Sequence, residues 1–221
     1  MRYIPAMAEL LLVLHDQNTT AGTTIEWCRS RQVDHEIVIA PEADFAALEG
    51  RGAIVFGGDM QVWEEAENPW LVKEKDFIRR FVESERRVLG ICLGSQLLAE
   101  QLGGTVHPMP EAEVGWYPVT VGERALTPLH WHESYFTLPS SCQRLARNDF
   151  CENQGFSLSP KVLGFQFHTE IDPARLERAL SGWNESLQGR VQKPDEIASQ
   201  ARSSMPLLAE WYFSVLDHWW A

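Results

Sequence analysis

The segment around Cys92 has the clearest chemical potential: it reads Gly-Ile-Cys-Leu-Gly-Ser-Gln over residues 90–96 and follows a short apolar run that begins at Val88. A strand, then Gly-x-Cys-x-Gly, then a helix is the arrangement of a nucleophile elbow, with cysteine in place of serine. Gly90 and Gly94 fit this turn because a side chain at either position would collide with the neighbouring strand and helix. The turn places the thiol at a helix N-terminus, where the helix dipole favours a thiolate. The pattern predicts a nucleophilic cysteine; the alternative is a buried cysteine in a glycine-rich turn.

A general base for this thiol is expected at the end of another apolar run. Residues 165–170 read Phe-Gln-Phe-His-Thr-Glu, so His168 and Glu170 stand two positions apart. In an extended segment, residues i and i+2 project to the same side, and the carboxylate can then reach the imidazole ring. A carboxylate on one ring nitrogen fixes the tautomer and supports the imidazolium. The alternative for His168 and Glu170 is a pair of solvent-facing side chains at a strand end.

The elements that must position these residues alternate along the first two-thirds of the chain. Short apolar runs predict buried strands at residues 10–14, 36–40, 53–56, 88–91 and 162–167, and helical patterns occur at residues 22–31, 70–84 and 95–102. Strands that are apolar throughout are covered on both faces, which is typical of a parallel sheet with right-handed crossovers. We therefore predict an α/β fold: a single three-layer domain with a central, mainly parallel sheet flanked by helices. The active site is expected at the carboxyl ends of the strands.

The rest of the chain has a different pattern. Residues 114–162 contain alternating segments with frequent Pro and Gly, which favour an antiparallel insertion or sheet edge. The remainder is predicted to be helical, since apolar residues recur at helical spacing from Leu207 to Trp220. Residues 1–221 are thus expected to form a single domain with a helical C-terminal segment over 173–221. The aromatic face of the last helix is expected to dock on the domain, with a dimer or partner surface as the alternative.

Four motifs of this sequence resemble those of the class I (triad) glutamine amidotransferases, and in particular the stand-alone members often described as GMP-synthase-like. GGDM at residues 57–60 resembles the oxyanion-strand turn of that family, and GICLGSQ at residues 90–96 resembles its nucleophile motif. EVGW at residues 113–116 resembles a segment near the glutamine pocket, and FQFHTE at residues 165–170 resembles the His-x-Glu motif. The second and fourth motifs, in this order, are the most specific part of the resemblance.

The resemblance implies a fold and a set of roles. The implied fold is that of the class I glutamine amidotransferases, which is flavodoxin-like. The implied catalytic residues are a nucleophile, an acid–base group and a carboxylate that orients it: Cys92, His168 and Glu170. The backbone N–H groups of Gly58 and Leu93 are implied as the oxyanion hole, and the expected position of the Leu93 N–H after the nucleophile agrees with this role. Gln96 and Gly57 are implied as contacts of the bound glutamine.

Four positions depart from the family pattern. Asp59 stands where the family usually has proline, which places a carboxylate beside a developing negative charge. Glu133 and Ser134 stand where Gly-Asp is usual, in the segment HWHES at residues 130–134. Thr169 also replaces a proline. These departures bear on the identity of the substrate more than on the chemistry.

Composition and charge argue against several classes of protein. Of the 221 residues, 44% are hydrophobic, which is typical of a soluble globular protein with a sizeable core. With 19 basic and 31 acidic residues the formal net charge is −12, which argues against nucleic acid and anionic membrane surfaces as partners. The four cysteines form no disulfide or zinc pattern, and neither a signal peptide nor a membrane-spanning stretch is recognisable. A reducing, cytoplasmic location is therefore expected.

No cofactor is expected for the implied reaction, because a cysteine nucleophile acts on an amide without a metal or an organic group. A metal site is the alternative for four side chains of the middle segment: His107, His130, His132 and Glu133. Their spacing does not fix the distances between ligand atoms, and the family resemblance already accounts for residues 130–134. We therefore predict no metal site.

The predicted activity is that of a glutamine amidotransferase-type amidohydrolase, whose Cys-His-Glu triad hydrolyses the side-chain amide of glutamine through a glutamyl thioester. The ammonia would serve a separate acceptor synthase, because the sequence shows no P-loop of its own. Two alternatives stay open: a self-sufficient hydrolase or transferase of small γ-glutamyl conjugates, and a non-catalytic regulatory module on the same scaffold. The expected partners are therefore glutamine or a γ-glutamyl compound and a synthase subunit, and the sequence also allows a homodimer.

Overall fold

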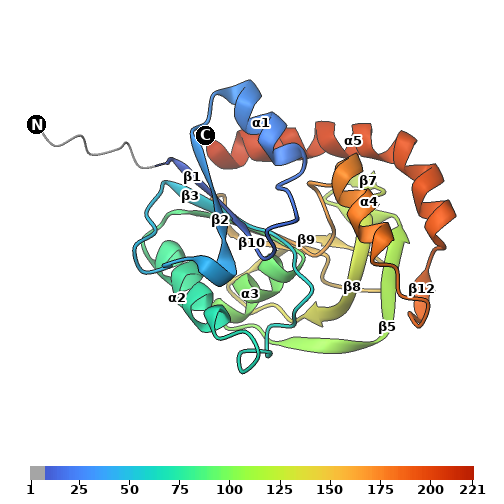
Figure 1. Cartoon of the computed structure of the whole chain (residues 1–221), viewed down its shortest axis with the longest axis horizontal. Helices are drawn as coiled ribbons and strands as arrows, with labels where there is room; N and C mark the ends of the chain where they lie inside the picture. Colours follow the sequence, from blue (N-terminus) through green and yellow to red (C-terminus); the bar gives the residue numbers. More distant parts are fainter. Residues whose placement is uncertain (1–7) are drawn as a thin grey trace, which may run out of the picture.

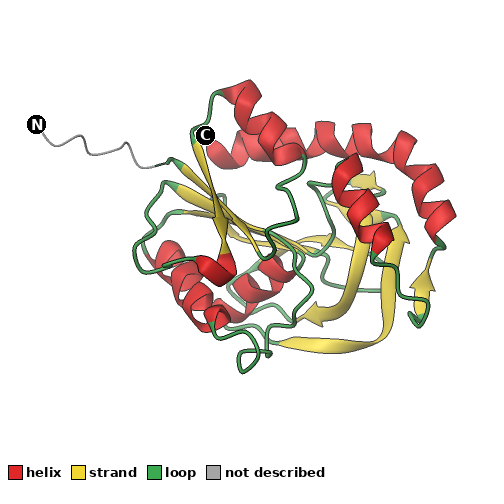
Figure 2. Cartoon of the chain, in the orientation of Figure 1, coloured by secondary structure: helices red, strands yellow, loops and turns green. Residues whose placement is uncertain are grey.

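The computed structural model describes residues 8–221 and contains a nine-stranded sheet and a smaller three-stranded sheet (Figures 1 and 2). The strand order of the large sheet is β2 (His35–Ile39), β1 (Leu10–Leu14), β3 (Gly52–Val55), β4 (Arg87–Ile91), β11 (Val162–Phe165), β10 (Gly155–Ser159), β9 (Gln143–Arg147), β6 (Val119–Val121) and β7 (Arg124–Leu126). Neighbours from β2 to β11 pair in parallel, whereas those from β11 to β7 are antiparallel. The predicted α/β class is confirmed, and the functional residues lie on the parallel half.

Helices cover both faces of the central parallel strands, which are apolar almost throughout. The predicted buried strand at residues 36–40 is instead the edge strand β2, in which Glu36 and Ile37 are exposed, because an edge strand has a neighbour on one side only. On β1, Leu10, Leu12 and Leu14 point to the side where Trp27 and Tyr212 pack. These two aromatic side chains come from α1 (Thr23–Arg31) and from α5 (Pro194–Trp220). Leu11 and Val13 point to the opposite face, which is covered by α2 (Trp70–Glu83) and α3 (Leu93–Gln101). The alternation of side chains along one strand therefore builds two separate cores.

The predicted strand at residues 162–167 ends earlier than expected, at Phe165. The chain then leaves β11, and His168 makes an isolated antiparallel bridge with Leu129 of the small sheet. The apolar run continues to Phe167 because that side chain is buried in the core. Hydrophobicity alone therefore overestimates the length of this strand.

The three-stranded sheet consists of β12 (Gly189–Val191), β5 (Val106–Trp116) and β8 (Leu129–Phe136). β5 and β8 pair antiparallel, with Glu113 opposite His132, which confirms the predicted antiparallel character of the middle segment. The apolar residues of this small sheet pack with Leu176 of α4 (Pro173–Ser181) and with Ile197 of α5. This layer places β8 and α4 beside the carboxyl ends of the parallel strands (Figure 1).

The C-terminal segment differs in one respect from the prediction. It contains β12 between its two helices, because three residues are too few for a periodic pattern to reveal a strand. The last helix, α5, is 27 residues long and includes Pro206. Its main apolar residues are buried against the domain: Leu208, Tyr212, Leu216, Trp219 and Trp220. The predicted docking is confirmed for these residues, whereas Leu207, at the start of the same predicted face, is 69% exposed.

Among residues 8–221, none of the helices combines the length and the apolar character that crossing a membrane requires. All four cysteines are in the thiol form. The prediction that the chain has no signal peptide concerns the N-terminus, of which residues 1–7 lie outside the described residues.

Candidate active site

Cys92 is the single residue between the end of β4 and the start of α3, and its backbone conformation is unusual. Its φ is 52° and its ψ is −113°, which is strained for a residue with a side chain. The Cys92 N–H donates to the carbonyl oxygen of Phe165 at 2.8 Å, and this bond ties the turn to β11. The conformation carries the chain from strand to helix in one step, so the sulfur projects beyond the edge of the sheet.

Two glycines make this turn possible by close packing. A Cβ atom on Gly90 would lie 2.4 Å from the carbonyl oxygen of Gly94, and a Cβ on Gly94 would lie 2.0 Å from that of Val55. No side chain fits at such distances. The predicted steric reason for glycine at both positions is confirmed.

His168 follows β11, and its ring and backbone are held by several contacts. Nδ1 lies 2.9 Å from Glu170 Oε1, and the same oxygen accepts from Nη2 of Arg175 at 2.9 Å. The backbone N–H of His168 donates to the Leu129 carbonyl at 2.9 Å, and the Thr23 N–H donates to the Glu170 carbonyl at 2.9 Å. The segment is thereby fixed to β8 and α1, and the predicted side-chain contact between His168 and Glu170 is present.

The charges of these groups follow from their surroundings. Burial alone would lower the pKa of His168, but the Glu170 carboxylate and the Cys92 sulfur outweigh it and raise the pKa to about 10. Burial alone would raise the pKa of Glu170, but His168 and Arg175 lower it to about 2. At neutral pH His168 is therefore an imidazolium and Glu170 a carboxylate.

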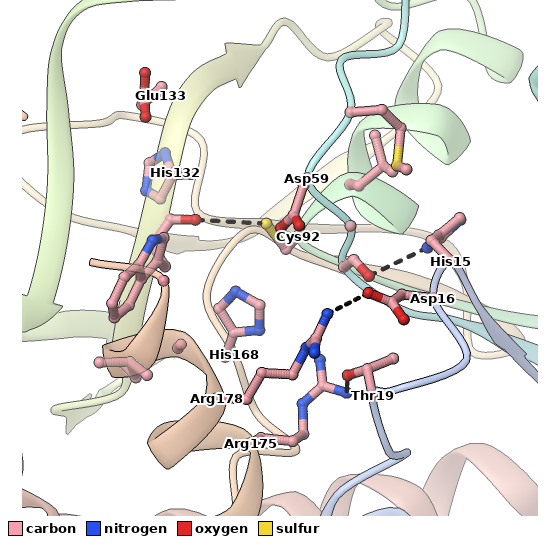
Figure 3. Close-up of a pocket in the computed structure, with 18 of the residues that line it drawn as sticks. His15, Asp16, Thr19, Asp59, Cys92, His132, Glu133, His168, Arg175 and Arg178 are labelled. Atoms are coloured by element: carbon pink, nitrogen blue, oxygen red, sulfur yellow. Dashed lines mark hydrogen bonds and ion pairs between the residues drawn. The ribbon is translucent and has the colours of Figure 1, made fainter. Parts of the chain in front are cut away.

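Cys92 and His168 open into one cavity of about 630 Å³ at the carboxyl ends of the parallel strands (Figure 3). The Cys92 Sγ atom lies 3.8 Å from the carbonyl oxygen of Trp131, which belongs to β8. A Cβ atom on Gly57 would lie 3.0 Å from His168 Cε1 and 3.2 Å from Cys92 Cβ. Gly57 is thus the neighbour of both side chains, and a larger residue there would crowd the reacting groups.

The backbone N–H groups of Gly58 and Leu93 belong to residues that line the cavity. Within residues 8–221, neither N–H has a hydrogen-bond acceptor. Leu93 is the first residue of α3, and the first N–H groups of a helix lack partners inside the helix. The two donors thus have no competing protein acceptor, as the predicted oxyanion role requires.

Gln96 lines the cavity but is only 4% exposed. Its Nε2 donates to Gln166 Oε1 at 3.1 Å and more weakly to the Ser134 carbonyl at 3.4 Å. Gln166 in turn directs its Nε2 toward Cys92 Sγ at 3.8 Å. The amide of Gln96 thus braces the wall of the cavity, and its contact with a substrate stays a prediction.

Sequence reasoning missed Gln166 and Arg175, which reach the centre of the site. Gln166 is completely buried beside the nucleophile, and Arg175 holds the carboxylate partner of His168. The one sequence feature that could have indicated Gln166 is its polar side chain between Phe165 and Phe167, in an otherwise apolar run. Nothing in the sequence separates Arg175 from Arg178, the other basic residue of α4.

A buried cluster of possible metal ligands lies next to the cavity, but with a different carboxylate from the one considered above. The ligand atoms of Glu113, His130 and His132 lie within 4.8 Å of one another. Glu133 is exposed instead, and His107 pairs with Thr105. Glu113 rather than Glu133 joins the two histidines because the register of β5 and β8 places Glu113 opposite His132.

The Glu113 carboxylate already has several protein donors. It accepts from Gln154 Nε2 and Asn148 Nδ2, both at 2.7 Å, and from His132 Nε2 at 3.1 Å. Nη1 of Arg190 lies 3.4 Å from Glu113 Oε1. These contacts give the carboxylate a full set of partners without an ion, and the absence of a metal stays a prediction.

Three of the four departures from the family pattern line the cavity. Asp59 and Glu133 are exposed residues that line the cavity (Figure 3). Ser134 is buried, and its hydroxyl donates to Gln61 Oε1 at 2.7 Å. Thr169 is buried as well and is not among the residues that line the cavity. The two carboxylates at the rim are the positions where these departures can meet a ligand.

Comparison with known proteins identifies the class to which this fold and site belong. The family model "Glutamine amidotransferase class-I" matches residues 15–181. The chain therefore belongs to the class I glutamine amidotransferase family, whose reaction is on an amide C–N bond. The matched range includes the cysteine turn, Gly57 and Gly58, and the segment of His168 and Glu170.

Several proteins are similar to this chain over much of its length. The glutamine amidotransferase-like protein YfeJ of Salmonella typhimurium is 32% identical over 188 residues, which are 75% of this chain and 77% of that protein. Gamma-glutamyl peptidase 4 of Arabidopsis thaliana is 26% identical over 179 residues, or 71% of this chain and 68% of that one. The glutamine-hydrolysing GMP synthase of Vibrio atlanticus is 33% identical over 141 residues, which are 59% of this chain but 26% of the synthase.

Solved structures agree with the observed fold. A glutamine amidotransferase from Thermotoga maritima superposes with a TM-score of 0.86 and 26% identity, covering 97% of this chain and 99% of that one. A glutamine amidotransferase from Methylobacillus flagellatus superposes with a TM-score of 0.87 at 22% identity, covering 97% and 94%. The predicted family resemblance and fold are confirmed.

Proposed function

We propose that this protein hydrolyses the side-chain amide of glutamine or of a γ-glutamyl compound through a covalent thioester on Cys92. The observation that supports this most is the shared cavity of Cys92 and His168, with Glu170 on the far nitrogen of the imidazole. A strained cysteine turn, an acid–base group and its orienting carboxylate form the arrangement that nucleophilic catalysis on an amide needs.

The first half-reaction forms the thioester. The Cys92 thiolate attacks the amide carbonyl carbon, so that a C–S bond forms and the carbonyl π pair moves to oxygen. The N–H groups of Gly58 and Leu93 donate to this oxyanion, each contributing about 3 kcal/mol when the geometry is right. As the oxyanion collapses, the C–N bond breaks and His168 gives its proton to the departing nitrogen.

The second half-reaction releases the acid. The neutral imidazole now takes a proton from water, and the resulting hydroxide attacks the thioester carbonyl. The same two N–H groups hold the second oxyanion. The C–S bond then breaks, its electron pair returns to sulfur, and the imidazolium is restored. Glu170 keeps the ring in place through both steps, and no cofactor takes part in them.

Two fates of the released nitrogen compete. In the first, ammonia passes to a separate synthase subunit. The similarity to glutamine-hydrolysing GMP synthase suggests this division of labour, because the alignment covers only 26% of that synthase. In the second, the protein is a self-sufficient hydrolase of γ-glutamyl conjugates. The cavity volume of about 630 Å³ favours the second, because pockets of this size hold ligands larger than a free amino acid. The relation to gamma-glutamyl peptidase 4 points the same way.

The experiment is a comparison of amine release from glutamine and from a panel of γ-glutamyl amides and dipeptides, with Cys92→Ser as the control. Release from a conjugate at least tenfold faster than from glutamine is the result expected for the self-sufficient hydrolase. Slow release from every substrate, with Cys92 still readily alkylated, would instead favour a glutaminase that needs its synthase. Ready release by the Cys92→Ser variant would exclude the thioester route.

A further inference from the structure

Another buried histidine, His15, lines the active-site cavity and has no part in the mechanism above. It directly follows β1 and is 4% exposed. Its Nδ1 lies 3.1 Å from the carbonyl oxygen of Gly57 (Figure 3). Its Nε2 lies 3.0 Å and 3.2 Å from the two carboxylate oxygens of Glu74, a completely buried residue of α2.

Both ring nitrogens of His15 face oxygen atoms that can only accept hydrogen bonds. A carbonyl oxygen offers no proton, so Nδ1 must carry one to bond with Gly57. An ionised carboxylate offers none either, so Nε2 must carry a second proton. His15 and Glu74 therefore form a buried ion pair in which the imidazolium has one donor left, and that donor is directed at the backbone of Gly57.

The surroundings of His15 support the charged form. Burial alone would lower the pKa of His15, but the charge of Glu74 and the hydrogen bonds to Glu74 and Gly57 outweigh it, and the pKa is raised above 6.5. Arg175 of α4 opposes this effect through its own charge. The ring of Trp70, whose centroid is 5.5 Å away, covers the pair.

The Gly57 carbonyl belongs to the same peptide group as the Gly58 N–H. In a trans peptide the oxygen and the hydrogen lie on opposite sides of the C–N bond, and none of the peptide bonds of residues 8–221 is cis. When His15 holds the carbonyl on one side, the N–H must point to the other. That direction is fixed from outside, because a peptide between two glycines has little conformational preference of its own.

We infer that the His15–Glu74 pair is a positioning device for the oxyanion hole, which holds the Gly57–Gly58 peptide so that the Gly58 N–H stays available to the oxyanion. The inference rests on the proposed thioester mechanism. His15 and Glu74 touch no reacting atom and act through the backbone. A neighbouring bond, from the Gly94 N–H to the Phe56 carbonyl at 3.1 Å, holds the preceding peptide, so the turn is secured at two successive carbonyls.

The test compares two double variants that both remove the buried charges. His15→Phe with Glu74→Leu keeps an aromatic ring beside Trp70 but has no donor for Gly57. His15→Asn with Glu74→Leu keeps a donor, since the Asn amide nitrogen lies about where Nδ1 does. Glu83→Gln, which removes an exposed carboxylate from the same helix, is the matched control.

We expect the Phe variant to lose roughly 10- to 100-fold in kcat, because one of two oxyanion donors is misdirected, with KM changed less than threefold. The Asn variant should recover at least a third of the wild-type kcat. Alkylation of Cys92 by iodoacetamide should be unchanged in both, because displacement of iodide forms no oxyanion. Equal losses in both variants, or alkylation slowed in parallel with kcat, would overturn the inference.

A crystal structure of the Phe variant gives a reading that does not depend on turnover. We expect the Gly57–Gly58 peptide to be rotated, with the Gly58 N–H turned from the cavity; an unchanged peptide would overturn the inference. If the wild-type protein hydrolyses no substrate, the proposed function fails, and this structural comparison still decides whether His15 holds the peptide.

Discussion

The backbone N–H of Gly94 donates to the carbonyl oxygen of Phe56 at 3.1 Å, which joins the nucleophile turn to the loop after β3. Gly94 follows Leu93, and Phe56 precedes Gly57 and Gly58. One hydrogen bond therefore links the two segments that supply the proposed oxyanion donors. The bond needs a close approach of α3 to β3 that only glycine permits, which explains why a residue without chemistry of its own stands in the centre of the motif.

Gly94→Ala should destabilise the protein by about 3 kcal/mol or more, because the new methyl group meets a backbone oxygen that cannot move away. The matched control is Gly182→Ala, where a Cβ would lie 3.8 Å from its nearest neighbour and where φ is −91°. That change should stay within about 1 kcal/mol of wild type. Urea denaturation of both variants measures the difference, and equal stabilities would contradict the steric account of the turn.

Glu170→Gln should lower kcat by roughly 10²-fold or more, because a neutral amide no longer supports the imidazolium or fixes its tautomer. The exposed Glu177 of α4 provides the control, as Glu177→Gln removes a carboxylate from the adjoining helix without touching His168. Steady-state kinetics on the best substrate decide the matter. A kcat of Glu170→Gln within threefold of wild type would remove the carboxylate from the catalytic set.

The activity should have an alkaline limit set by His168. Its pKa is raised to about 10, so the ring stays protonated from pH 7 to about 9 and loses its proton as the pH rises through that value. A neutral ring cannot protonate the leaving nitrogen, and kcat should therefore fall near pH 10. In Glu170→Gln the fall should begin at lower pH, since one of the two groups that raise the pKa of His168 is gone. Circular dichroism at each pH shows that the fold is intact, and coincident limits in the two proteins would contradict this assignment.

The pattern of cysteine reactivity should single out Cys92. Burial raises the pKa of Cys28 and of Cys151 to about 12, so both thiols stay protonated and unreactive at neutral pH. Burial also raises the pKa of the partly exposed Cys142. Brief treatment with iodoacetamide followed by peptide mass spectrometry should find Cys92 modified at least tenfold more than any other cysteine. Preferential labelling of Cys142 would show that the Cys92 sulfur is not activated.

The cysteine turn could be predicted from the sequence because its determinants are local. A strand, a turn with two glycines and a helix are encoded within residues 88–102, and the contact of His168 with Glu170 spans two positions of one extended segment. The parallel strands are equally visible, since burial on both faces makes them continuously apolar.

The supporting contacts could not be predicted because they join distant parts of the chain. His15 and Glu74 are 59 positions apart, and Glu113 meets His132 only through the pairing of β5 with β8. The same limit made Glu133 appear to be the partner of His130 and His132. Such partners are set by sheet register and helix packing, which composition and spacing do not contain.

The most direct test of the central claim is to look for the covalent intermediate itself. Acid quenching during turnover of a γ-glutamyl substrate, followed by mass spectrometry, should find the Cys92 peptide heavier by one glutamyl group. The Cys92→Ser variant should show no thioester and lose at least 10³-fold in kcat, while Cys142→Ser behaves as wild type. Turnover by Cys92→Ser within threefold of wild type, or a glutamyl group found on another cysteine instead, would contradict the account.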